Sequence, residues 1–232
     1  MASKYPYLDT YLNRYKTFIF FDFEATAFTH MPIELSMVFT SFNNYHFNII
    51  ETYSTYIKTD DKIGKYVTEL TGIDKDILDR NGVTFINVIN NLATLFSKYP
   101  SKLFLSYSKN DLAILKNAID NKNLKQEQIK LLMLRNFLDV QKYLARLIRD
   151  ENGNILSLKK LSDYLNITQD FKFHSALDDS IAMVKIFNAY FNNYEKILTD
   201  AFNNFKNLPI YKRQESSDYT EIEIKEILKE QL

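Results

Sequence analysis

Three short acidic segments carry the side chains of this sequence that could do chemistry. They are residues 21–24 (FDFE), 110–111 (ND) and 174–179 (HSALDD). Each falls where a strand is expected to end or a helix to begin, and from such places carboxylates of distant segments can converge on divalent metal ions. The sequence therefore predicts a metal centre assembled from three parts of the chain.

Asp22 and Glu24 form the strongest pair. They are two residues apart, so on a strand both side chains point to the same face and can share one cation. The alternative is an exposed strand end, which the bulky neighbours Phe20, Phe21 and Phe23 disfavour. Because an unpaired buried carboxylate is costly, the pair needs a metal or a cationic partner. Hard oxygen ligands of this kind suit Mg²⁺ or Mn²⁺.

The other two segments carry weaker signals when each is taken alone. An Asp in the first turn of a helix, such as Asp111, commonly serves the helix dipole, and a His before a helix, such as His174, is commonly a cap or a surface residue. Position strengthens the signal of Asp111, because the expected strand at 102–107 delivers it to a sheet edge where it can meet Asp22. The combination with the other two acidic segments strengthens that of His174 and Asp179. Histidine can take a proton from water near neutral pH, while Asp179 would complete the ligand set.

The remaining ionisable residues have no such placement. Glu34 lies within an expected strand and is predicted to make a structural hydrogen bond, whereas Asp60 and Asp61 are predicted to lie in a solvated loop. His30 and His46 have no partners in sequence. A phosphatase that needs a dense histidine cluster or a covalent aspartate is therefore disfavoured.

The expected elements are a β-meander followed by α/β alternation. Strands are predicted at 17–24, 33–42, 45–58, 102–107 and 134–140, with a turn at Asn43-Asn44, and helices at 84–99, 110–122, 141–149, 157–166 and 175–193. The continuous apolar run at 17–24 is typical of a central strand covered on both faces, and 84–99 repeats apolar residues with a helical period after a capping Thr84. This order predicts an α/β fold with a mixed five-stranded sheet flanked by helices.

The end of the sequence differs in character from the rest. Residues 16–195 are expected to form one domain, and 196–232 a helical C-terminal extension with a polar stretch at 212–218 and a charged helix at 221–232. A terminal helix docked on the domain is the first interpretation. Homo-oligomerisation or contact with a protein partner is the second.

Composition limits the classes of protein that remain. A chain of 232 residues with 46% hydrophobic residues can bury a full core. The 29 basic and 29 acidic residues balance to +0, so a polynucleotide would be held by local contacts and metals rather than by a long-range basic field. The absence of cysteine excludes thiolate metal sites. With no signal-like or membrane-spanning apolar run, a cytoplasmic location without membrane contact is expected.

The three segments resemble a known family when they are read in order. The strings FDFEAT (21–26), YSKND (107–111) and HSALDD (174–179) are similar to the three motifs of the DEDDh superfamily of 3′–5′ exonucleases. The strings ELTGI (69–73), FLDVQKYL (137–144) and LKKLSDYLNI (158–167) are similar to the branch of KapD-type proteins and of exonucleases that trim interfering RNA and histone messenger RNA. The resemblance covers about residues 16–195.

This resemblance implies a ribonuclease H-like fold and two-metal-ion hydrolysis of phosphodiester bonds from the 3′ end of a single strand or a 3′ overhang, releasing 5′-mononucleotides. The matched metal ligands, for two Mg²⁺ or Mn²⁺ ions per site, are Asp22, Glu24, Asp111 and Asp179, and His174 matches the general base. The positions that match substrate-contacting ones are Ala25, Thr26, Leu70, Thr71 and Gly72.

Three functions stay open, because recognition of a 2′-hydroxyl depends on side-chain placement that no motif here encodes. RNA is the expected substrate, DNA is the first alternative, and a non-catalytic nucleic-acid-binding adaptor on the same fold is the second. The complete set of five residues argues against the adaptor. Two departures, Ala27 where many members have Gly and Ser108-Lys109 in the second motif, leave ligands and base intact. Lys109 is expected to be solvated, with a phosphate contact as the alternative.

Overall fold

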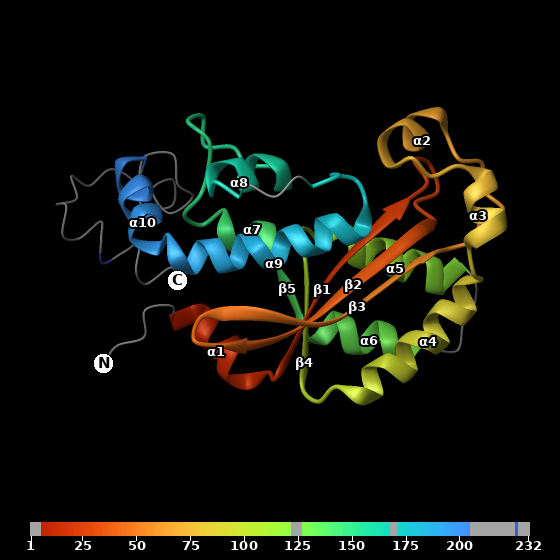
Figure 1. The fold of residues 1–232 in the computed structure, drawn as a ribbon, viewed down its shortest axis with the longest axis horizontal. Coiled ribbons are helices and arrows are strands. Elements are labelled where there is room, and N and C mark those ends of the chain that lie inside the picture. The colour runs from red at the N-terminus through yellow and green to blue at the C-terminus, as the bar shows by residue number, and fades with distance from the viewer. Residues whose placement is uncertain (1–5, 122–126, 168–170, 205–225, 227–232) are drawn as a thin grey trace.

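A five-stranded mixed sheet forms the centre of the protein (Figure 1). The computed structural model describes residues 6–121, 127–167, 171–204 and 226. The strands are β1 (Thr17–Ala25), β2 (Pro32–Asn43), β3 (His46–Tyr56), β4 (Lys102–Ser106) and β5 (Phe137–Asp139), in the spatial order β3-β2-β1-β4-β5. The first three form an antiparallel meander, and β4 and β5 continue the sheet in parallel with β1. The predicted α/β fold with a mixed five-stranded sheet is confirmed.

Helices cover both faces of this sheet (Figure 1). In the described part of the chain they are α1 (Pro6–Arg14), α2 (Lys65–Thr71), α3 (Lys75–Asn81), α4 (Phe85–Lys98), α5 (Asn110–Asn121), α6 (Glu127–Arg135), α7 (Val140–Leu144), α8 (Leu158–Tyr164), α9 (Ala176–Asn192) and α10 (Tyr194–Asn203). One core lies between the sheet and α7, α8 and α9, and the other between the sheet and α4, α5 and α6. None of the described helices is long and apolar enough to cross a membrane.

Strand β1 belongs to both cores. Phe18 and Phe20 pack into the core beneath α9, whereas Ile19 and Phe21 pack into the core beneath α4 and α5. A strand buried on both faces has no polar side to alternate with, and for this reason the sequence is continuously apolar there. The ring of Phe187, on α9, lies 5.8 Å from that of Phe20 and ties the helix to the centre of the sheet.

The end of β1 is less fully paired than its start. β1 pairs with β2 as far as Ala25, but its pairing with β4 covers only Thr17 to Phe20. Its last residues therefore extend past the parallel ladder with β4. A register shift between Glu24 and Ala25 then marks the end of the strand.

Some predicted bounds are wrong. The strand predicted at 134–140 spans only Phe137–Asp139, because α6 continues to Arg135 through a leucine-rich stretch that suits either structure. The helix predicted at 141–149 is α7, which ends at Leu144. Thr84 does occupy the N-cap of α4, but its side chain makes no capping hydrogen bond.

The predicted C-terminal extension is described only in part. Its proposed boundary at 195–196 falls inside α10, whose Ile197 and Ala201 are buried in the same core as α9. The polar stretch at 212–218 and, apart from Glu226, the predicted helix at 221–232 lie outside the described residues. The division into two domains stays a prediction.

Removing the aromatic ring that joins α9 to β1 should weaken the whole fold. We expect Phe187→Ala to lower the free energy of unfolding by about 3–5 kcal/mol, since the side chain is fully buried and leaves a cavity. Urea denaturation would measure this loss. Phe28→Ala is the matched control, because Phe28 is 91% exposed and its removal should change stability by less than about 0.5 kcal/mol. Equal losses in the two variants would contradict the packing described for α9.

Candidate active site

A cavity of about 690 Å³ opens at the C-terminal end of β1. The five residues predicted to carry out the chemistry all line it: Asp22, Glu24, Asp111, His174 and Asp179. They come from β1, from the first turn of α5, and from the start of α9 with the residues just before it. Segments that are far apart in sequence thus meet at one edge of the sheet.

Asp111 is fixed to β1 by a hydrogen bond from the backbone. The amide nitrogen of Phe23 donates to Asp111 Oδ1 at 3.0 Å, and this contact is buried. Phe23 lies between Asp22 and Glu24 and beyond the last residue that pairs with β4, so its amide is available to a side chain. The bond sets the carboxylate of the second acidic segment beside the two of the first.

The third segment is held by two further hydrogen bonds. The backbone nitrogen of His174 donates to Asp179 Oδ2 at 3.2 Å, and the backbone nitrogen of Ala176, at the start of α9, donates to Glu34 Oε2 at 3.2 Å. The predicted structural hydrogen bond of Glu34 is therefore confirmed. Because Glu34 pairs with Glu24 across β1 and β2, it brings the beginning of α9 to the end of β1.

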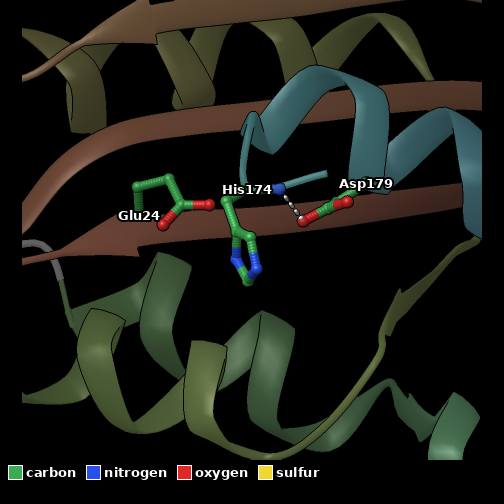
Figure 2. Close-up of side chains that lie close together, drawn as sticks. All are labelled: Glu24, His174 and Asp179. Atoms are coloured by element: carbon green, nitrogen blue, oxygen red, sulfur yellow. Dashed lines mark hydrogen bonds between the residues drawn. The ribbon is translucent and has the colours of Figure 1, made fainter. Parts of the chain in front are cut away.

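His174 stands between two of the carboxylates. Figure 2 shows the side chains of Glu24 and Asp179 on either side of the His174 side chain, with the bond from the His174 backbone to Asp179 drawn as a dashed line. The backbone of His174 has a φ of 68°, a left-handed conformation that is uncommon for residues other than glycine. The side chain of His174 is exposed, so water can reach it.

The donor set fits a divalent cation. Ligand atoms of Glu24, His174 and Asp179 all lie within 4.8 Å of one another. Asp179 Oδ1 is buried and has no hydrogen-bond partner among the described residues. A buried carboxylate oxygen without a partner is costly, and oxygen donors are the ligands that Mg²⁺ and Mn²⁺ prefer.

Burial and mutual repulsion make the carboxylates poor acids in the absence of metal. Burial, together with the nearby charge of Asp179, raises the pKa of Glu24 to about 8. Burial likewise raises the pKa of Asp111 and of Asp179 to about 7 each, and that of Asp22 well above its ordinary value. No Lys or Arg is found among the described residues that line the cavity. A cation from outside the chain would therefore favour the charged forms of these groups.

The residues matched to substrate contacts lie outside the lining of this cavity. Ala25 is at the register shift that ends β1, and the Thr26 hydroxyl accepts a hydrogen bond from the Met31 amide at 3.0 Å. The Thr71 hydroxyl donates to the Val67 carbonyl at 2.9 Å within α2. Both hydroxyl groups thus serve local structure.

Leu70 lies on α2 as well, one residue before Thr71. Gly72 caps this helix with a φ of 80°, and a Cβ atom added there would lie 3.4 Å from Lys172 Nζ. The end of α2 therefore reaches the segment that precedes His174. Substrate contact by Leu70, Thr71 and Gly72 stays a prediction.

Other cavity residues were not predicted from the sequence. They include Thr29 and His30 after β1, and Asn110 and Asn117 on α5. Asn117 Nδ2 donates to the Thr29 carbonyl at 2.8 Å, and the Thr29 hydroxyl donates to Asp61, so the predicted solvated position of Asp61 is only partly correct. The seven-residue spacing of the two asparagines, which puts them on one helix face, is the signal that could have revealed them.

Comparisons with known proteins agree with the fold. A family model described as Exonuclease, RNase T, matches residues 19–187. Among curated proteins, no sequence matches the chain. Similar solved structures include the nuclease domain of 3′hExo, a DEDDh family member, bound to rAMP, with a TM-score of 0.65, 20% identity and coverage of 77% of this chain and 93% of that one.

Two further solved structures cover less of their own length. Cell-death related nuclease 4 (CRN-4) has a TM-score of 0.64 at 19% identity, with 77% of this chain and 64% of that chain covered. E. coli Exonuclease I in complex with a dT13 oligonucleotide has a TM-score of 0.61 at 20% identity, with 81% of this chain and 43% of that chain covered. The chain thus spans less than two thirds of either protein. At these identities the likeness concerns the fold.

The raised pKa values predict that the metal-free site lowers the free energy of unfolding by an amount that depends on pH. Because the folded-state pKa of Glu24, about 8, lies above its value in the unfolded chain, the folded protein binds more protons between about pH 4 and pH 8. The free energy of unfolding should therefore fall as pH rises through this window. We expect Glu24→Gln to be more stable than the unaltered protein by about 1–3 kcal/mol near pH 8 in chelator, and by less than about 1 kcal/mol near pH 5.

Urea denaturation at the two pH values would measure this difference. Glu69→Gln is the control, because Glu69 is an exposed residue of α2 that pairs with Lys65. Added Mg²⁺ should stabilise the unaltered protein more than Glu24→Gln, since a ligand stabilises the state that binds it. A Glu24→Gln variant less stable than the unaltered protein near pH 8 in chelator would contradict the expectation that the charged Glu24 carboxylate destabilises the fold.

Proposed function

The chain belongs to the RNase T family of exonucleases, within the DEDDh superfamily, and on that premise we propose that it removes 5′-mononucleotides from the 3′ end of single-stranded RNA by two-metal-ion hydrolysis. The observation that carries this proposal is the meeting of four carboxylates and one imidazole in a single cavity whose described lining has no Lys or Arg. Such a cavity favours cations, and hydrolysis of a phosphodiester needs them to offset the charge of the phosphate.

The four carboxylates are proposed to hold the ions. They are Asp22, Glu24, Asp111 and Asp179. Two Mg²⁺ or Mn²⁺ ions, when bound, would polarise the scissile phosphate and stabilise the oxygen that leaves. The chain itself contributes the fixed positions of the carboxylates, because Asp111 and Asp179 each accept a backbone hydrogen bond. In Asp179 this leaves the buried Oδ1 for a cation.

We assign His174 the role of general base. Its side chain is exposed and lies between Glu24 and Asp179, so it can take a proton from the attacking water and release it to solvent. The bond from its backbone to Asp179 Oδ2 holds the residue in place. The same proximity would also suit a metal ligand, and the variant described below separates the two roles.

The substrate class is proposed from solved structures with similar folds. Similar folds occur in the nuclease domain of 3′hExo bound to rAMP and in a 3′-exonuclease that recognises the histone mRNA stem-loop, which favours RNA. DNA is the second candidate, because E. coli Exonuclease I has a similar fold in complex with dT13. A non-catalytic adaptor is disfavoured by the complete set of carboxylates and imidazole in the cavity.

Removing one carboxylate should abolish the reaction. We expect Asp22→Asn to lower the rate of nucleotide release by about 10³-fold or more, the order seen when a group that stabilises the transition state is lost. The assay is a time course with single-stranded RNA and DNA of one sequence, labelled at the 5′ end, in Mg²⁺ or Mn²⁺. Progressive shortening from the 3′ end is expected, faster for RNA.

Asp178→Asn is the matched control for this experiment. Asp178 lies beside Asp179 but outside the cavity lining, where it accepts a hydrogen bond from the Lys172 amide, and its variant should keep most of the activity. Unchanged release by Asp22→Asn, or release of internal fragments by the unaltered protein, would overturn the proposal.

His174→Ala should separate proton transfer from metal binding. We expect the rate to fall by about 10²–10⁴-fold, the usual contribution of a general base, while the concentration of Mn²⁺ needed for half-maximal thermal stabilisation changes by less than about threefold. Steady-state rates and thermal melting at varied Mn²⁺ would measure the two effects. A parallel loss of metal affinity would make His174 a ligand rather than a base.

A further inference from the structure

A second hollow lies on the other side of α5 from the candidate active site. This hollow, which we call the basic groove, has a volume of about 540 Å³. Its lining residues come from α5 and the residue before it, from β5, and from α7 and the turn after it; those used below include Lys109, Lys116, Phe137, Asp139, Lys142 and Arg146. It lies at the edge of the sheet that β5 forms. None of the five active-site residues, Asp22, Glu24, Asp111, His174 and Asp179, lines it.

The groove has the opposite charge to the active-site cavity. Four cationic side chains line it, from Lys109, Lys116, Lys142 and Arg146, against one carboxylate, that of Asp139. Asp139 Oδ1 accepts a hydrogen bond from the Lys142 backbone amide at 2.8 Å and so caps α7. In a chain whose charges balance to +0, this is a local concentration of positive charge.

Apolar and aromatic surface lies among these cations. The half-buried Phe137 and the exposed Leu134 line the groove, and the Arg146 guanidinium lies 5.8 Å from the centre of the Tyr143 ring, which is itself buried. Proteins that hold single strands without sequence preference combine these features, since cations bind phosphates and aromatic rings stack on bases.

Helix α5 separates the two hollows by a low ridge. Its residues Asn110, Ile114 and Asn117 line the active-site cavity, whereas Lys116, and Lys109 just before the helix, line the groove. Ala113 lines both hollows and is exposed, so a small side chain stands where they meet. A polynucleotide could cross the helix at this point without meeting a bulky side chain.

From these observations we propose that the basic groove binds the sugar-phosphate backbone of the substrate strand upstream of the scissile bond, after the strand has crossed α5 at Ala113. The proposal rests on the proposed function, because it takes the 3′ end to lie among the carboxylates. Lys109 lies two residues from Asp111 in the sequence. It would therefore be the first cation that the polynucleotide meets after it leaves the cavity. Lys116, Lys142 and Arg146 would contact phosphates farther from the 3′ end.

The test is a charge reversal at the two exposed lysines that are farther from the catalytic residues. We expect Lys116→Glu combined with Lys142→Glu to weaken binding of a labelled RNA strand of about twelve nucleotides by at least tenfold in chelator, where no turnover occurs. A plot of the logarithm of the association constant against the logarithm of the salt concentration should become shallower. Its slope should change by about 1.4, because each phosphate contact of a single strand contributes about 0.7. Fluorescence anisotropy would measure both.

Activity provides a second readout. In Mg²⁺ the double variant should have a raised KM for the long strand but an unchanged rate on a dinucleotide, which is too short to reach the groove. Lys116→Gln with Lys142→Gln should show a smaller loss of affinity, since it removes charge without reversing it. The control is Lys159→Glu with Lys185→Glu, two exposed lysines of α8 and α9 outside the groove, which should bind as the unaltered protein does.

The outcomes separate this proposal from the one on which it rests. Equal affinities of the groove variant and the control variant for the long strand would overturn the groove assignment, whatever the activity. Equal losses for the dinucleotide and the long strand would also overturn it. If the unaltered protein cleaved neither substrate, the proposed function would fail, while the anisotropy measurement would still decide whether the groove binds the strand.

Discussion

The active site depends on one backbone amide that its sheet leaves unpaired. β1 continues beyond Phe20, where its pairing with β4 stops, and the Phe23 amide then needs a partner because a buried N–H without one is costly. Asp111 supplies that partner from the first turn of α5. β1 extends beyond its pairing with β4, and this extension fixes the position of the Asp111 carboxylate. The pair Asp22 and Glu24 and the start of α5 could not otherwise be held in register.

The same arrangement gathers negative charge in a place that is poor at solvating it. Glu34 adds a further carboxylate next to Glu24, but it points its oxygen at the first amides of α9, where a helix favours an anion. Burial raises the pKa of Glu34 more than this hydrogen bond lowers it, and the carboxylates in the cavity have raised pKa values as well. The charged forms of all these groups therefore weaken the fold. Sites that act on phosphates commonly contain such locally unfavourable arrangements, which the rest of the fold must offset. Here the two apolar cores on either side of β1 do so.

Local patterns in the sequence were enough to predict the strand that carries Asp22 and Glu24, and the order of the three acidic segments predicted the family. They did not predict the bond between Phe23 and Asp111, because it depends on where β4 stops pairing relative to β1, a property of two strands at once. The fifth strand was predicted to be longer than it is for a local reason, because the leucines before Arg135 suit helix and strand alike. The basic groove was hidden for another reason. Its cations lie on or next to α5 and α7, and the overall balance of charge gives no sign of their proximity.

The position of α9 along the chain has a consequence for biosynthesis. The strand at the centre of the sheet is made at Thr17–Ala25, but His174 and Asp179 become available only after all the segments between them have been made. Domains fold as the necessary segments emerge, and contacts that join distant segments form last. The complete set of carboxylates therefore cannot assemble on a short nascent chain. The acidic cavity is thus completed only when residues 174–179 have been made.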